Sequence, residues 1–330
     1  MMAEMKGMIL AAGYGERLWP LTADRTKPAL PVLGKPLVGY VAEYLARFDI
    51  SDVIVNLHHR PDSVRASLGD GSEFGVNLNY VHEPKILGTS GALDNARDLF
   101  DRETFVVING KIITDVDLSA ALKIHRERNA LATLVLLQNS NFERFSVVET
   151  SEGMVTGFSG APTRTASSAE GAPLMFTGIQ ILEPRIFDYI PRGVFSHSTV
   201  DVYPPAIAKG ERIVGHVSTG MWYELSTLQR YLDISLALLK REGRDVYAGR
   251  DASIDQTAEV SESILWNDVT IERKAKLNRT ILGDGVRVAG GEQFQNAVIV
   301  RADLLAGKTA PAKALKGSLE GDKFVVPLSQ

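Results

Sequence analysis

The sequence predicts an α/β protein in which a doubly wound, mostly parallel sheet precedes a short β-solenoid. From Lys6 to about Gln138, short β-rich runs alternate with helical patterns, which is typical of parallel strands joined by helical crossovers. After Gly249, apolar residues recur every 17 residues, which is typical of stacked coils. A chain of 330 residues is long enough for two domains, and we expect them at residues 1–240 and 241–330.

The elements of the first domain follow from its apolar spacing. Strands are predicted at Gly7–Ala11, Asp52–Leu57, Val76–Val81, Thr104–Ile108, Leu131–Leu137, Leu174–Leu182 and Arg212–Val217. Helices are predicted at Pro36–Phe48, Ser90–Phe100, Leu118–Glu127 and Val200–Lys209, with a helical turn after Pro184. A final helix starts at a cap formed by Ser226 or Thr227 and directs an apolar face toward the core. The aperiodic segment Gly160–Gly171 should be a surface loop or a partly mobile flap.

The repeat after Gly249 can be followed in columns of residues 17 positions apart. The columns are Ile254, Ile271 and Val288; Val260, Leu277 and Phe294; Ile264, Ile281 and Val298; and Leu265, Leu282 and Ile299. A meander of unrelated strands has no reason to keep one period in all columns, so the repeat favours a solenoid with triangular coils. About three coils make a short solenoid, whose exposed end invites capping or self-association.

Composition excludes several classes of function. A net charge of -4 provides no general cationic surface for nucleic acid, so nucleic acid is not an expected partner. The chain has no cysteine, which excludes thiolate chemistry and agrees with a reducing, cytoplasmic location. The first apolar run, Met8–Ala12, is too short for a signal peptide or a membrane span. The six histidines have no spacing typical of metal ligands.

A glycine-rich segment directly after the first strand carries the strongest functional pattern. It reads LAAGYGERLWPLT at Leu10–Thr22 and continues as KPALPVLGKP at Lys27–Pro36. Glycines at positions 13 and 15 can take positive φ and direct backbone amides at an anion. Arg17 adds a rigid donor fork and Lys27 a second positive charge, so the segment suits a triphosphate.

This segment resembles the signature of the sugar-1-phosphate nucleotidyltransferases, LAAGxGxRLxPLTxxxxKPxLPVxGKP, at residues 10–36. The resemblance covers about residues 6–240 and continues in Glu83, Pro84 and LGTSGAL at Leu87–Leu93. The sequence of this last motif is similar to that of members that make GDP-mannose. The resemblance implies a Rossmann-like sheet that binds the nucleotide at its carboxyl edge. It also implies that the solenoid is a left-handed β-helix of hexapeptides.

The resemblance implies a reaction between a nucleoside triphosphate and a sugar 1-phosphate, in which the loop amides and cations neutralise phosphate charge, with Mg²⁺ as cofactor. It implies nucleotide binding by Leu10, Ala11, Ala12, Gly13, Gly15, Glu83, Gly88 and Thr89. It implies sugar-phosphate binding by Asn109, Gly110, Thr177 and Gly178, and catalytic roles for Arg17, Lys27 and Lys111.

Three departures fall on positions that the family uses for metal and sugar. NGKIITDVDL at Asn109–Leu118 carries Lys111 where the family has a metal-binding Asp, and WYELST at Trp222–Thr227 carries Glu224 at the second metal position. If the fold brings Lys111 and Glu224 together, we expect a salt bridge where the metal would sit. The family's EKP segment is replaced by SGAP at Ser159–Pro162, which lacks the charged contacts.

Three functions stay open on the sequence. In the first, the protein is an active enzyme in which Glu224 and Asp115, or Asp117, recruit Mg²⁺ with the substrate phosphates and Lys111 replaces part of the metal charge. In the second, it is a nucleotide-sugar-binding regulatory subunit. In the third, the fold is mainly an assembly module. A homo-oligomer or hetero-oligomer through the β-helix is compatible with all three, and no membrane partner is expected.

Overall fold

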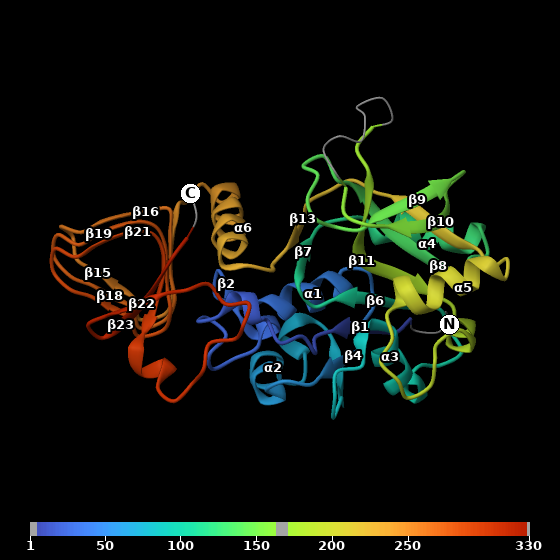
Figure 1. Cartoon of the computed structure of the whole chain (residues 1–330), viewed down its shortest axis with the longest axis horizontal. Coiled ribbons are helices and arrows are strands. Elements are labelled where there is room, and N and C mark those ends of the chain that lie inside the picture. The colour runs from blue at the N-terminus through green and yellow to red at the C-terminus, as the bar shows by residue number, and fades with distance from the viewer. Residues whose placement is uncertain (1–4, 163–170, 329–330) are drawn as a thin grey trace. The chain divides into compact units, whose positions relative to one another are not determined.

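The computed structural model describes residues 5–162 and 171–328, so most of the predicted loop Gly160–Gly171 lies outside the described residues. The chain divides into two compact units (Figure 1). The first unit contains the chain up to Gly13, Val38–Pro61 and Leu68–Trp222, and the second contains Tyr14–Leu37, Asp62–Ser67 and Tyr223–Gln330. The predicted boundary between residues 240 and 241 stays a prediction.

The first unit is built on a nine-stranded sheet of order β5-β4-β1-β6-β11-β8-β12-β10-β9. The strands are β1 (Gly7–Leu10), β4 (Asp52–Leu57), β5 (Asn77–His82), β6 (Phe105–Asn109), β8 (Ala132–Gln138), β9 (Val147–Ser151), β10 (Met154–Ser159), β11 (Leu174–Leu182) and β12 (Ile213–Val217); the short β7 (Ile112–Thr114) lies outside this sheet. Strands β5, β4, β1 and β6 are parallel, as are β8 and β12. The predicted α/β class with a mostly parallel sheet is confirmed.

Two strands depart from the parallel pattern, β10 and β11, and β10 runs antiparallel to its neighbours β12 and β9. Strand β11 runs antiparallel to both of its neighbours, β6 and β8. It follows the β9–β10 hairpin in the chain, and no helix lies between that hairpin and β11 among the described residues. The tight turn of the hairpin reverses the chain between β9 and β10, and β11 keeps the reversed direction of β10. The hairpin itself was not predicted, although its turn has the sequence Glu152-Gly153, both with positive φ.

Most helices lie close to the predicted residues, but the helix at Pro61–Leu68 was not predicted, and the helix expected at Ser90–Phe100 ends at Asn95, before a 3₁₀ turn at Arg97–Leu99. They are α1 (Leu37–Ala46), α2 (Pro61–Leu68), α3 (Gly88–Asn95), α4 (Leu118–Glu127), α5 (Tyr203–Ala208) and, in the second unit, α6 (Leu228–Arg241). Asp117 caps α4 by accepting from Ser119 N at 2.9 Å, and Thr227 caps α6 by accepting from Arg230 N at 3.2 Å. No helix in residues 5–162 and 171–328 is both long and apolar enough to cross a bilayer.

The second unit contains the β-helix, whose coils stack in the predicted columns. Its strands are β14 (Val246–Ala248), β15 (Ser253–Ile254), β16 (Glu259–Ser261), β17 (Ser263–Leu265), β18 (Thr270–Ile271), β19 (Lys276–Leu282), β20 (Arg287–Val288), β21 (Gln293–Arg301), β22 (Ser318–Glu320) and β23 (Lys323–Pro327). Ile254 pairs with Ile271, and Ile271 with Val288, in parallel register. The other three columns pair in the same way. The repeat prediction is therefore confirmed residue by residue.

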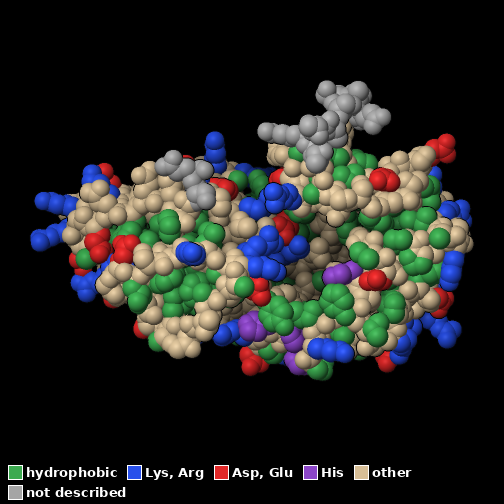
Figure 2. Space-filling model, viewed as in Figure 1, with side chains coloured by type: hydrophobic (Ala, Val, Ile, Leu, Met, Phe, Trp, Pro, Cys, Tyr) green, Lys and Arg blue, Asp and Glu red, His purple; other side chains and the backbone are tan. Residues whose placement is uncertain are grey.

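The last coil ends in a hairpin of the same chain. Strand β23 pairs antiparallel with β21, and β22 pairs with β23. This hairpin covers the backbone groups of β21 that a further coil would otherwise pair with. On the face shown in Figure 2, basic and acidic side chains are interspersed over the β-helix rather than segregated.

Candidate active site

In the first unit, the carboxyl ends of four parallel strands bring the sequence-predicted residues of this unit to one edge. Leu10 of β1 lies in register with Asn56 of β4 on one side and with Asn109 of β6 on the other. Leu57 of β4 pairs with His82 of β5, directly before Glu83. Open α/β sheets bind ligands at this edge, so the topology agrees with the predicted site.

A buried polar network connects these strand ends. Ala11 N donates to Asn56 Oδ1 at 2.7 Å, and Asn56 Nδ2 donates to Glu83 Oε1 at 2.6 Å. Leu87 N donates to Glu83 Oε2 at 3.1 Å. The first two bonds join the ends of the neighbouring strands β1, β4 and β5, and the third closes the turn from Glu83 to Leu87, so the network fixes the start of the glycine-rich segment relative to the turn that precedes Gly88.

Asn56 was missed by sequence reasoning, although it carried a signal. It is the only side chain with a polar amide in the apolar strand Asp52–Leu57, and it is 3% exposed. A buried amide must find partners, which marks such a residue as part of a network. Its partner Glu83 is fully buried, and burial raises the pKa of this carboxyl against the opposing hydrogen bonds from Asn56 and Leu87. Contact between Glu83 and a nucleotide base stays a prediction.

Gly88 and Thr89 form the first turn of α3 and pack against the segment before α5. Gly88 has φ +78°, and a side chain there would overlap with the carbonyl of Ser196. Ser90 N donates to that same carbonyl at 3.1 Å, and Ser198 N donates to Thr89 Oγ1 at 2.9 Å. Glycine at position 88 is therefore required by backbone conformation and close packing together.

The predicted sugar-phosphate residues also meet in the first unit. Gly110 N donates to Leu10 O at 2.9 Å, and a Cβ at Gly110 would lie 2.9 Å from the same oxygen. Gly178 has φ +83° and lies against the Asn109 amide, where a side chain would overlap with it. Thr177 is buried, with its hydroxyl donating to Val135 O at 2.8 Å, so its side chain stabilises the irregularity in β11.

The second unit contains the later part of the glycine-rich segment. Gly15 has φ +71°, as predicted, and a Cβ there would lie 2.8 Å from Lys27 Cβ. The prediction of positive φ at Gly13 is wrong, because its φ lies outside the positive range. Arg17 is exposed in a short 3₁₀ turn, Glu16–Leu18, and Lys27 begins a second one, Lys27–Ala29.

The residues at the altered metal positions lie in different surroundings. Lys111 is partly exposed, next to β7. Asp115 is exposed, and its Oδ1 accepts from Met221 N at 2.6 Å, while the Asp117 carboxylate caps α4. Glu224 is 4% exposed, and its backbone carbonyl accepts from Arg230 Nε at 2.8 Å. The predicted salt bridge between Lys111 and Glu224 stays a prediction.

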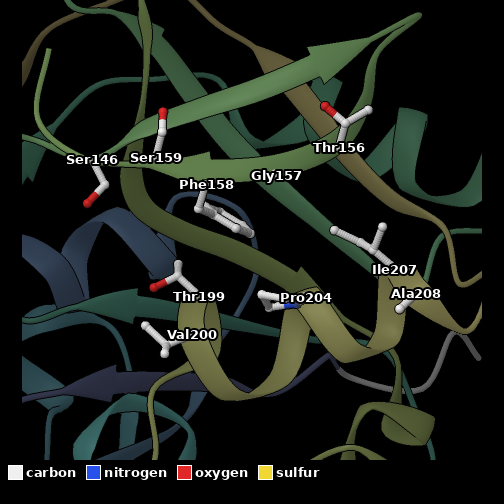
Figure 3. Close-up of a pocket in the computed structure, with 10 residues that line it drawn as sticks. All are labelled: Ser146, Thr156, Gly157, Phe158, Ser159, Thr199, Val200, Pro204, Ile207 and Ala208. Atoms are coloured by element: carbon white, nitrogen blue, oxygen red, sulfur yellow. The ribbon is translucent and has the colours of Figure 1, made fainter.

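A pocket of about 690 Å³ opens in the first unit between β10 and the helical segment 198–208 (Figure 3). Its lining is uncharged: Ser146, Thr156, Gly157, Phe158, Ser159, Thr199, Val200, Pro204, Ile207 and Ala208. The Phe158 ring stacks on Tyr203, with ring centres 6.1 Å apart. Ser159, on the rim, begins the SGAP segment that departs from the family's EKP.

Comparison with known protein families identifies the family of each part of the chain. The Nucleotidyl transferase family matches residues 6–241, and a GlmU-like C-terminal hexapeptide family matches residues 245–297. The chain belongs to the nucleotidyl transferase family. Its enzyme class is that of the sugar-1-phosphate nucleotidyltransferases, and the hexapeptide match identifies the coils as a left-handed β-helix.

Similar proteins differ in the nucleotide that their names state. A UTP–glucose-1-phosphate uridylyltransferase of Synechocystis is 30% identical over 87% of this chain and 77% of its own length. A mannose-1-phosphate guanylyltransferase of Mycobacterium tuberculosis is 28% identical over 90% and 80%. A solved structure, described as a putative glucose-1-phosphate thymidylyltransferase from Bacillus anthracis, has a TM-score of 0.62 and 27% identity, covering 71% of this chain and 94% of its own.

Proposed function

We propose that the protein condenses a nucleoside triphosphate with the 1-phosphate of an uncharged hexose to give an NDP-sugar and pyrophosphate. GTP and mannose 1-phosphate are the first pair to test. The observation that carries the proposal is the family signature beginning at the carboxyl end of β1. The Asn56–Glu83 network supports it, because it holds the Ala11 amide and the turn before Gly88 at that edge.

The reaction requires that the protein align the two substrates and provide positive charge near their phosphates. A phosphate oxygen of the sugar 1-phosphate forms a bond to the α-phosphorus, while the bond from that phosphorus to the bridging oxygen breaks and pyrophosphate leaves. Arg17, Lys27 and the amides of residues 11–15 are the groups proposed to hold the triphosphate, and the Lys111 ammonium the group to neutralise developing charge. Asn109, Gly110 and Gly178 are proposed to orient the sugar phosphate.

Members of this family generally use a divalent metal, which supplies charge neutralisation on the phosphates when bound. The residues at the two family positions do not fit a two-carboxylate magnesium site, because an ammonium group occupies position 111. Residues 5–162 and 171–328 contain no cluster of three His, Asp or Glu side chains suited to a metal. Mg²⁺ held by Glu224, or by Asp115, together with substrate phosphates remains our proposal.

The pocket beside Ser159 is proposed to contribute to sugar choice, although Asn109, Gly110 and Gly178 do not line it. Its lining contains hydroxyl and apolar groups but no charged side chain. Burying an unpaired carboxylate or ammonium group there would be costly, so a neutral hexose suits the pocket better than a uronic acid or an amino sugar. The sequence GTSGAL supports GTP as the nucleotide substrate, and a guanylyltransferase is among the similar proteins.

The test is pyrophosphate release from a panel of nucleotide and sugar pairs. The pure protein is incubated with Mg²⁺, each of GTP, UTP, dTTP and ATP, and mannose or glucose 1-phosphate. We expect turnover with one pair well above the others. Absence of pyrophosphate in every combination would contradict the proposed activity.

A second candidate function is a nucleotide-sugar-binding regulatory subunit, and Lys111 is the observation that favours it. The double substitution Lys111→Asp with Glu224→Asp separates the two candidates. If the chain is a decayed enzyme, restoring both carboxylates at the family positions raises metal-dependent turnover. If Lys111 is catalytic, the same change lowers turnover. Nucleotide affinity measured by calorimetry on both proteins serves as the control for an intact binding site.

A further inference from the structure

Arg25 connects the glycine-rich segment to the β-helix within the second unit. Its guanidinium makes a two-point contact with Asp24, from Nε to Oδ1 at 2.9 Å and from Nη2 to Oδ2 at 3.0 Å. The same Nη2 donates to Asp284 Oδ2 at 2.7 Å. Asp284 belongs to a β-helix turn, where its other oxygen accepts from Asn267 N at 3.1 Å. A residue that lies 259 positions away in sequence thus fixes the side chain of Arg25.

A second line of contacts reaches the same segment from the other side of Lys27. The guanidinium of Arg25 lies 5.1 Å from the centre of the Trp266 ring, a distance at which a cation is attracted to the ring face. Trp266 Nε1 donates to the hydroxyl of Tyr231 at 2.9 Å, and that hydroxyl donates to Pro31 O. The β-helix and α6 therefore hold the segment both before and after Lys27.

The backbone around Lys27 is in turn packed against the glycine-rich turn. Thr26 is 1% exposed, and its N–H donates to Ser63 Oγ at 3.2 Å. Lys27 Cβ is close enough to Gly15 that no side chain fits there. Because closely packed groups cannot shift separately, a displacement at Arg25 would move Lys27 and the turn at Gly15 together.

We propose that Arg25 is a positioning residue that uses Asp284 and Trp266 of the β-helix to hold Lys27 and the Gly15 turn in the geometry that binds triphosphate. This inference rests on the proposed function. It makes the β-helix part of the nucleotide-binding machinery. The coils provide the Asp284 carboxylate and the Trp266 ring, which hold the Arg25 guanidinium in addition to its pairing with Asp24. Lysine at this position would keep the charge but lose the fixed two-point geometry.

The experiment compares Arg25→Met with Arg279→Met in the full-length protein. Arg279 is a matched control, because its Nη2 also binds a carboxylate of the same unit, Asp233 Oδ1 at 2.8 Å, with similar exposure of the arginine (30% against 25%). Turnover of GTP and mannose 1-phosphate, or of the pair active in the panel, is measured for both. We expect Arg25→Met to lower kcat/KM for the nucleotide about 10- to 100-fold, because small misplacements of binding groups are expensive, and Arg279→Met to leave it within about twofold.

Hydrogen exchange gives a second measurement that needs no turnover. In Arg25→Met, peptides within residues 14–30 should exchange faster while peptides of residues 253–300 keep their protection. Arg25→Lys should recover part of the protection and part of kcat/KM. A purely structural role would instead raise exchange across the β-helix and lower the melting temperature with no preference for the nucleotide step.

The two inferences fail in distinguishable ways. If the wild-type protein turns over no pair, the proposed function falls, and exchange in residues 14–30 still decides whether Arg25 holds the segment. If Arg25→Met and Arg279→Met have the same kcat/KM, or if residues 14–30 exchange at the wild-type rate in Arg25→Met, the positioning role of Arg25 is overturned.

Discussion

The β-helix and the carboxyl edge of the sheet in the first unit distribute their stabilising contacts in opposite ways. In the β-helix, each apolar residue stacks on a similar residue 17 positions away, as in the column of Ile254, Ile271 and Val288. At the sheet edge, the Asn56–Glu83 network occurs once and connects positions that are 45, 27 and 4 residues apart. The first arrangement repeats one interaction, whereas the second depends on single, unrepeated atoms.

Because of this difference, a substitution should destabilise the two regions to different extents. A repeat loses one of several equivalent contacts when a side chain is shortened. A buried polar network loses the partner of every group bonded to the missing atom, and each unsatisfied group then carries its full desolvation cost. The predictions below test whether the two regions respond in this way.

Asn56→Ala should have the largest effect. It leaves the Ala11 N–H and Glu83 Oε1 without their Asn56 partner, while Glu83 Oε2 keeps its bond from Leu87 N, and we expect a loss of about 3 kcal/mol in the free energy of unfolding. Urea denaturation followed by fluorescence measures it. Asn79→Ala is the matched control, since Asn79 donates to Asp52 at 2.8 Å on the exposed surface of β5 and should cost no more than about 0.5 kcal/mol. Equal costs for the two asparagines would break the comparison.

Gly88→Ala should have the next largest effect. Positive φ and overlap with the Ser196 carbonyl combine at this residue, so we expect a loss of about 2 to 3 kcal/mol. Gly69→Ala isolates the backbone contribution, because Gly69 has φ +57° and open space around it, and should cost about 1 kcal/mol. Thermal unfolding of the two variants gives the difference. If Gly69→Ala were as costly as Gly88→Ala, close packing would contribute nothing.

A smaller effect is expected in the β-helix. Ile271→Val removes one methylene from a residue that is 2% exposed, and should cost about 1 kcal/mol. Ile254→Val makes the same change in the same column, where the side chain is 40% exposed, and should stay within about 0.5 kcal/mol. Unfolding followed by tryptophan fluorescence measures both. A cost above that of Asn56→Ala would reverse the order of the two regions.

The smallest effect should be a dependence on pH that separates the units. His125 is buried in the first unit, with Nδ1 2.9 Å from Thr133 Oγ1 and Nε2 3.1 Å from Glu183 Oε1, whereas residues 245–328 contain no histidine. Burial lowers the pKa of His125 below 6.5, so the unfolded chain takes up the proton more readily. Stability is therefore fully present above pH 6.5 and falls as the pH drops below it.

Unfolding midpoints measured between pH 5 and 8 test whether stability falls on acidification. His125→Asn, which cannot titrate in this range, should make the profile of the first unit less steep, while His59 and His216, whose pKa burial also lowers, keep the remaining dependence on pH. His82→Asn, at an exposed residue, should leave it unchanged. A wild-type midpoint that rises on acidification would contradict the assignment.

Much of the fold could be predicted because its patterns are local. Asp52–Leu57, Leu118–Glu127 and Leu174–Leu182 begin and end at the predicted residues, since apolar period and capping are properties of neighbouring positions. The β9–β10 hairpin and the reversed direction of β11 could not be read in this way. The pairing of β11 with β6 and β8 depends on residues far apart in the chain.

The candidate site was predictable to a similar degree. The glycine-rich segment, Glu83 and Gly88 were singled out by their types and spacing. Asn56 and Arg25 were not, because their roles arise from partners that sequence spacing does not indicate: Ala11 and Glu83 for Asn56, and Asp284 and Trp266 for Arg25. A polar residue within an apolar strand was the only available signal, and it pointed to Asn56 alone.

The two-part architecture, the coil columns and the family signature could be read from the amino-acid sequence, because each consists of residue types at short or regular intervals. The partners of the buried polar groups at the sheet edge, and the bond between Arg25 and Asp284, became apparent in the folded structure alone. The physical reason is that hydrogen bonds and ion pairs require atoms within about 3 Å, and residues distant in the chain reach that separation only after folding.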